Sequence, residues 1–291
     1  MRVTQGMLTS NMLRNLSNSY SQMGKYQEQL YTGKKISQPS DDPVVAMKGI
    51  NYRSQLSEVQ QYKRNIGTVH NWTDNSDAAL DKATQAMQRI RELTVQASNG
   101  TYEDGQRANI AKEIRQLKEH LGTIANTKVN DKYIFNGANT TEAPVDLTDY
   151  TVDSTQTPVQ IEVSAGVKIQ VNVNPQPVFS QKLFEDIEAF ADALEGDGSD
   201  EELSDYLGTF DQHIDNIVNE RADLGARMNR VELIEGRIEA QEVSATKMMS
   251  ENEDADIEKV ITNLKTQESI HRAALAVGSR IIQPTLMDFL R

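Results

Sequence analysis

The chain has 291 residues, 37% of them hydrophobic and only 5% aromatic, with a net charge of −13 at pH 7 and no cysteine. The low aromatic content favours long helices packed through aliphatic side chains, and the missing cysteines exclude disulfides and thiolate chemistry. The negative charge argues against nucleic acid as a partner, because the phosphate backbone would be repelled. No stretch reaches the roughly 18 uncharged apolar residues of a membrane-spanning helix, so no membrane insertion is expected.

A first amphipathic helix is expected over residues 1–32. The segment 33–43 contains Gly33, Pro39 and Pro43 and should end it. Asp42 followed by Pro43 is typical of the start of a second helix, expected to run to about Gly67. The apolar residues of the first helix recur at helical spacing and form one stripe: Leu8, Met12, Leu16, Tyr20, Met23 and Leu30.

Two further helices are expected before the middle of the chain. The first should end at Asn99–Gly100, where Gly100 is suited to a C-terminal cap. The second spaces its apolar residues four and three apart, which is a heptad seam. Because the connection is short, these two helices should be antiparallel neighbours. The seam includes Ile110, Ile114, Leu117 and Leu121.

The periodicity changes in the middle of the chain. Residues 159–163 and 167–173 alternate apolar and polar side chains, and Gly166 lies between them. This pattern predicts a β-hairpin with Gly166 in its turn. We expect residues 143–178 to be a small β insertion that buries one face at most and contributes little to the helices.

Helical periodicity returns in the last third. Residues 183–205 hold ten acidic and no basic residues and are expected to be a solvated loop and a helix start. Ser199 with Glu202 matches a capping box, and about 45 residues of helix should follow, with Leu224, Met228 and Val231 in its seam. An acidic break is expected at 250–256. The last helix carries a second apolar stripe: Ile257, Ile261, Leu264, Ile281, Ile282, Leu286, Phe289 and Leu290.

Together these elements predict a mainly α protein, a long antiparallel helical bundle or coiled-coil rod with a small β insertion. The helical core domain should comprise residues 43–142 and 179–254, and the β insertion residues 143–178. Ile114, Leu117 and Leu121 are expected to pack in antiparallel register against Leu224, Met228 and Val231, or their near neighbours. The terminal helices, 1–42 and 255–291, should form an inner assembly domain, because nothing else in the chain covers their apolar stripes.

The sequence contains no recognisable catalytic chemistry. The four histidines are isolated, and no phosphate loop, dinucleotide fingerprint or nucleophile elbow is present. We therefore expect no catalytic residue, no cofactor and no metal site. A secreted enzyme carried in the insertion is one alternative, but it would need a metal or nucleophile motif between residues 143 and 182, and none is present there. A coiled-coil adhesin is another, but it would give the block at residues 34–43 no role.

Four blocks of sequence resemble the flagellin family. LYTGKKISQPSDDP (30–43) and IRELTVQASNGT (90–101) resemble its N-terminal signatures, and RADLGARMNRVE (221–232) and DADIEK (254–259) are similar to its C-terminal ones. The opening MRVTQGMLTSN, the segment YIFNGANT (133–140) and the ending IIQPTLMDFLR are most like the branch that joins the flagellar hook to the filament. The blocks occur in the family's order on both sides of the β insertion.

This resemblance implies an extracellular structural adaptor at the hook-filament junction of the bacterial flagellum. It implies partners too: hook-associated protein 1, flagellin, further copies of the chain in a ring, and an export chaperone before secretion. The first twenty residues lack the apolar centre of a secretory signal, and the family is exported through the flagellar type III channel instead. A minor flagellin of the filament is the alternative that the resemblance leaves open.

Overall fold

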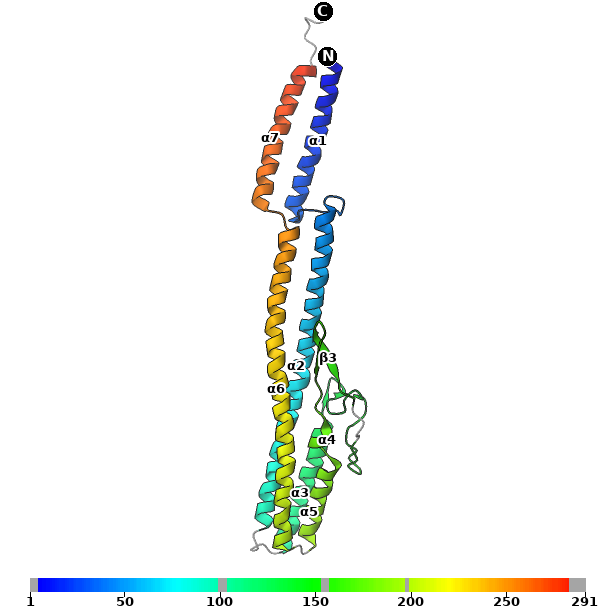
Figure 1. Cartoon of the computed structure of the whole chain (residues 1–291), viewed down its shortest axis with the longest axis vertical. Coiled ribbons are helices and arrows are strands. Elements are labelled where there is room, and N and C mark those ends of the chain that lie inside the picture. The colour runs from blue at the N-terminus through cyan, green and yellow to red at the C-terminus, as the bar shows by residue number, and fades with distance from the viewer. Residues whose placement is uncertain (1–4, 99–103, 153–156, 197–198, 283–291) are drawn as a thin grey trace, which may run out of the picture. The chain divides into compact units, whose positions relative to one another are not determined.

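The computed structural model describes residues 5–98, 104–152, 157–196 and 199–282. Over this part of the chain the fold is mainly helical, as predicted, with two small antiparallel sheets. None of the described helices is both long enough and apolar enough to cross a membrane. The helices are α1 (Gln5–Thr32), α2 (Pro43–Ala97), α3 (Asp104–Ala125), α4 (Pro175–Val178), α5 (Gln181–Glu195), α6 (Asp200–Glu253) and α7 (Ile257–Ile282); the strands are β1 (Lys128–Val129), β2 (Lys132–Tyr133), β3 (Gln160–Ser164) and β4 (Val167–Gln170) (Figure 1).

The chain divides into two compact units. The terminal unit comprises residues 1–58 and 241–291, and the central unit comprises residues 59–240. The division falls within α2 and α6, not at residues 42/43 and 254/255 where the sequence suggested boundaries. The ends of these helices belong with the terminal unit because they contact each other there: the Asn252 side chain donates to the Val45 carbonyl at 3.0 Å. The β insertion lies inside the central unit.

Helix α2 is continuous from Pro43 to Ala97, so the end expected near Gly67 was wrong. A single glycine inside a helix costs only about 1 kcal/mol relative to alanine. Its neighbours Ile66 and Val69 are both 0% exposed, and burying them stabilises the helix by more than that. The helix start was correct: the Asp42 carboxylate accepts hydrogen bonds from the backbone N–H groups of Val44 and Val45 at 3.0 and 3.1 Å.

Helix α5 corrects the prediction for the acidic stretch, which was expected to be a loop. Ser180 caps it, with its hydroxyl accepting from the backbone N–H of Leu183 at 3.1 Å. The helix packs against α3 (Figure 1). The apolar residues of its inner face were obscured by the acids between them, and all are buried: Leu183, Phe184, Ile187, Phe190, Ala191 and Leu194.

Three acids of α5 pair with bases of α3, which are distant from them in sequence. Arg115 contacts Glu188, Asp192 and Glu195 at 3.0, 2.8 and 2.7 Å, and Lys118 contacts Glu188 at 2.8 Å. Burial alone would raise the pKa of Glu188, but the hydrogen bonds from Lys118 and Arg115 lower it overall. This cross-helix pairing permits a highly acidic helix to pack on the bundle.

The predicted hairpin is confirmed, but it is part of the core. Strands β3 and β4 pair antiparallel, with Ile161 opposite Ile169, and Gly166 in the turn has a φ of +71° that favours glycine. The inner side chains of the hairpin form a second hydrophobic cluster with α2 and α6: Val163, Ile169 and Val171 pack with Ile66, Val69, Val231, Ile234 and Ile238. The expectation that the insertion contributes little to the helices was therefore wrong.

The predicted bundle residues fall into two clusters. Ile110, Ile114, Leu121 and Leu224 are buried in the larger cluster, and Leu117 and Met228 are partly buried against it. Val231 belongs to the hairpin cluster. Five of the six residues expected to meet, Ile114, Leu117, Leu121, Leu224 and Met228, therefore share one cluster, whereas Val231 does not, and α5 packs along α3 as well. The predicted capping box at Ser199 and Glu202 is present, with reciprocal bonds of 3.2 and 3.3 Å.

Candidate assembly surface

Helices α1 and α7 of the terminal unit pack along one another (Figure 1). Residues that are at least partly covered recur three and four apart on both helices, which is the spacing of a coiled-coil seam. On α1 these are Thr9, Met12, Leu16, Ser19, Met23 and Tyr26, and on α7 they are Val260, Leu264, Gln267, His271, Ala274 and Gly278.

A polar pair and a glycine bring the two helices together within this seam. Ser19 is 7% exposed, and its hydroxyl accepts a hydrogen bond from the Gln267 amide at 3.0 Å. Met12 lies so close to Gly278 that an added Cβ would be 1.6 Å from the methionine methyl carbon. Glycine at this position therefore permits the close approach of the two helices, and Val260 is the one hydrophobic side chain of the seam that is buried among the described residues.

The large apolar side chains of the terminal unit lie mostly on its outside. Ala245 and Val260 are the buried hydrophobic residues among the described part of this unit. A unit that exposes this many large apolar side chains and buries so few is a candidate for contact with other proteins. The exposed set includes Met7, Leu8, Leu13, Tyr20, Leu30, Tyr31, Val44, Met47, Ile50, Val243, Met248, Ile257, Ile261, Ile270, Leu275 and Val277.

The two stripes suggested by the sequence are divided between these surfaces. Met12, Leu16, Met23 and Leu264 are partly covered in the seam. The side chains of Ile281 and Ile282 are not described, and Leu286, Phe289 and Leu290 lie outside the described residues. The remaining predicted residues are exposed: Leu8, Tyr20, Leu30, Ile257 and Ile261.

Sequence reasoning missed the exposed apolar residues at the start of α2. Val44, Met47 and Ile50 are 60%, 64% and 65% exposed. They are spaced three apart directly after the Asp42 cap, so one helical face could have been identified from that spacing. The sequence did not show that this face lies uncovered.

The loop between α1 and α2 docks on the break between α6 and α7. The backbone N–H of Lys35 donates to the Glu253 carbonyl at 2.7 Å, and that of Ala255 donates to the Gly33 carbonyl at 2.8 Å. Gly33 ends α1 with a φ of +69°, a left-handed conformation typical of a helix C-terminus. The blocks at residues 30–43 and 254–259, distant in sequence, thus meet in one junction.

Charged side chains reinforce this junction. Glu253 is 5% exposed, and its carboxylate contacts Arg53 at 2.7 Å and Lys34 at 3.6 Å. Lys34 also contacts Asp254 at 2.6 Å, and this hydrogen bond lowers the pKa of Asp254 and raises that of Lys34. Gly49 leaves room for the buried carboxylate, because a Cβ there would be 2.5 Å from Glu253 Oε1.

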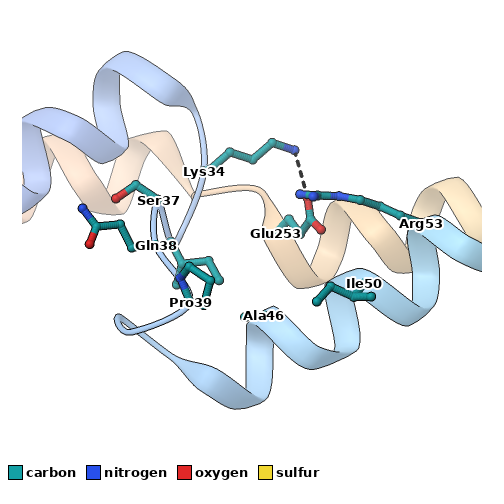
Figure 2. Close-up of a pocket in the computed structure, with 9 residues that line it drawn as sticks. Lys34, Ser37, Gln38, Pro39, Ala46, Ile50, Arg53 and Glu253 are labelled. Atoms are coloured by element: carbon teal, nitrogen blue, oxygen red, sulfur yellow. Dashed lines mark hydrogen bonds and ion pairs between the residues drawn. The ribbon is translucent and has the colours of Figure 1, made fainter.

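A pocket of about 250 Å³ opens beside the junction (Figure 2). Ile36, Pro39, Ala46 and Ile50 form its apolar lining, and Lys34, Arg53 and Glu253 supply charged groups. Across the described residues, no group of three or more acidic, histidine or cysteine side chains is placed to hold a metal ion.

Two family models match the chain. The bacterial flagellin N-terminal helical region matches residues 3–140, and the bacterial flagellin C-terminal helical region matches residues 207–290. Flagellar hook-associated protein 3 of Escherichia coli is 26% identical over 94% of this chain and 95% of its own length. Flagellin of Bacillus subtilis is also 26% identical, over 95% of each chain.

Solved structures share the fold. A putative flagellar hook-associated protein from Vibrio parahaemolyticus superposes with a TM-score of 0.69 at 20% identity, covering 74% of this chain and all of that one. Bacillus cereus FlgL superposes with a TM-score of 0.60 at 22% identity, covering 69% of this chain and 99% of that one.

Proposed function

The chain belongs to the flagellin family, whose members are structural proteins of the bacterial flagellum, and on that premise we propose that it joins the hook to the filament. In this role it sits between hook-associated protein 1 and the first flagellin subunits. It is exported through the type III channel, guided by a chaperone, and assembles outside the cell as a ring of its own copies.

The observation that carries this proposal is the exposed apolar surface of the terminal unit. A self-contained protein would bury these side chains, whereas Ala245 and Val260 are the only buried hydrophobic residues in the described part of this unit. Each large apolar side chain that becomes fully buried contributes about 1.5 to 3 kcal/mol, so contact with neighbouring subunits supplies the missing core. We propose that Leu8, Tyr20, Leu30, Ile257 and Ile261 face those neighbours.

The central unit is suited to carrying mechanical stress along the flagellum. Its helices share one large hydrophobic cluster, and the hairpin cluster holds α2 and α6 from the side. Salt bridges between helices add to this, such as Arg221 of α6 with Asp77 and Asp81 of α2 at 2.7 and 2.6 Å. Packed helices of this kind transmit torque without any active site.

Electron microscopy with an antibody against the chain tests this proposal. Intact flagella from parent cells should be labelled in one narrow zone between hook and filament. Flagella from cells that lack the gene serve as the control and should show no label. Label spread along the filament, or absent from flagella altogether, would contradict the junction role.

A minor filament subunit is the second candidate. It is favoured by the match to B. subtilis flagellin over 95% of both chains. The purified chain would then form long filaments by itself, with label along their whole length. If the purified chain forms no filament and the antibody labels only the junction zone, the role of a minor filament subunit is excluded.

A further inference from the structure

Tyr31 is the most exposed of the large hydrophobic side chains in the described residues, at 92%. It lies in the last turn of α1, one residue before the helix ends at Thr32. A tyrosine combines a flat apolar ring with a hydroxyl that seeks a hydrogen-bond partner, which is why tyrosines are enriched at the centres of protein interfaces. At this exposure the ring packs against almost nothing in the part of the chain that the structure describes.

The junction pocket begins three residues later, at Lys34, and has the matching chemistry. Ile36, Pro39, Ala46 and Ile50 offer an apolar lining to a ring, and its volume of about 250 Å³ leaves room for one. Arg53 and Glu253 meet in the pocket at 2.7 Å (Figure 2). The guanidinium can donate to a phenol oxygen, and the carboxylate can accept from a phenol O–H.

The pocket is also continuous with uncovered apolar surface. Ile50, which lines it, is 65% exposed, and Met47 and Val44 extend the same face of α2 toward the helix start. An occupant that enters the pocket would therefore cover this face as well. Tyr31 of the same chain does not fill the pocket, because its side chain is 92% exposed.

We propose that Tyr31 of one copy inserts into the junction pocket of a second copy, a contact that rests on the assembly role proposed above. The two surfaces differ, so the contact is heterologous: every bound pair still presents one free Tyr31 and one free pocket. Successive copies can then join in the same way until a ring closes. The pocket and Tyr31 both lie next to the loop at residues 33–42, so neighbouring copies at the same level present them to each other.

Cysteine pairs test this contact directly, since the chain has no cysteine of its own. Cells produce the full chain carrying both Glu28→Cys and Met47→Cys, and their isolated flagella are oxidised and run on a non-reducing gel. Glu28 is exposed one turn before Tyr31 on α1, and Met47 is exposed one turn before Ile50 on α2, so Tyr31 and the pocket lining stay intact. A ladder of covalent oligomers is expected. The matched control carries Glu28→Cys with Val243→Cys, which is 70% exposed and does not line the pocket, and it should stay monomeric.

Several outcomes would overturn the proposal. A chain that is present in the flagella but forms no ladder shows that the face of α1 around Tyr31 in one copy does not meet the face of α2 around Ile50 in its neighbour. A ladder of equal strength from the Val243→Cys control shows that the contact is not specific to the pocket. If the parent chain itself is absent from flagella, the proposed function fails and this contact fails with it, so the two failures are distinguishable.

Single substitutions give an independent measure. Because Tyr31 is so exposed, Tyr31→Ala should leave the circular dichroism of the free chain unchanged, yet lower the amount incorporated into flagella about tenfold, as for an interface hot spot. Tyr31→Phe keeps the ring and should retain most of the incorporation. Equal incorporation of the alanine variant and the parent would contradict the proposal.

Discussion

Replacing Phe190 with alanine tests whether α5 is a true element of the bundle core. Phe190 is 0% exposed, and its ring lies 5.4 Å from that of Phe210 in an edge-on arrangement and 5.2 Å from that of Tyr206. Transfer of the ring out of water contributes about 1.5 to 3 kcal/mol, and each favourable aromatic pair adds about 0.5 to 1.5 kcal/mol.

Together with the cavity that alanine leaves, we expect Phe190→Ala to lower the free energy of unfolding by about 4 kcal/mol, within the range of about 3 to 5 for buried phenylalanines. For a unit of this size the melting temperature should fall by about 8 to 15 °C. Chemical denaturation of the full chain, followed by circular dichroism, measures this directly.

The matched control is Gln212→Ala on the exposed face of α6, which should stay within about 0.5 kcal/mol of the parent. Should Phe190→Ala unfold within about 1 kcal/mol of that control, α5 does not contribute to the core. The acidic stretch would then be the solvated segment that its composition suggested.

Three further predictions concern the hairpin, the junction and the C-terminus. Ile169→Ala should lower the free energy of unfolding by about 3 kcal/mol because Ile169 is 4% exposed between hairpin and helices; the exposed Lys168→Ala on the same strand should be neutral, and equal unfolding curves would refute this packing. At the junction, the pKa of Asp254 lies below its ordinary 3.8 and that of Lys34 above 10.5. The ion pair of Lys34 and Asp254 therefore stabilises the junction at pH values between the two pKa values. It is lost as pH falls through the lowered pKa of Asp254 or rises through the raised pKa of Lys34. Protection of the backbone amides at residues 33–35, taken as the exchange rate relative to the intrinsic rate at each pH, should fall at both extremes, and Lys34→Met should abolish this pH dependence of protection; an unchanged protection profile in that variant would exclude the pair as its cause. Removing residues 282–291 should leave the thermal melt of the central unit unchanged but prevent incorporation into flagella; normal filament growth on the truncated chain would contradict it.

The sequence alone determined the elements that depend on local patterns. The cap at Asp42, the capping box at Ser199 and Glu202, and the turn at Gly166 were all identified correctly, because each depends on residues within a few positions of one another. The alternation of residues 167–173 likewise identified the hairpin. The sequence blocks at residues 30–43 and 221–232 indicated the family independently of the fold.

What the tertiary structure decided is which surface each element covers. The acids of α5 appeared solvated in sequence, but Arg115 and Lys118 of α3 pair with them across the bundle. Val231 continues a heptad in sequence, yet the hairpin rather than α3 covers it.

The terminal stripes show the same limit most clearly. Helical spacing identified Met12 and Leu8 as members of one apolar face, but Met12 packs on Gly278 while Leu8 stays 48% exposed. A periodic pattern shows that one face of a helix is apolar. It does not show what covers that face, because the covering residues are distant in sequence or belong to another copy. Only the packed structure separated the seam that the chain fills itself from the surface that it leaves exposed.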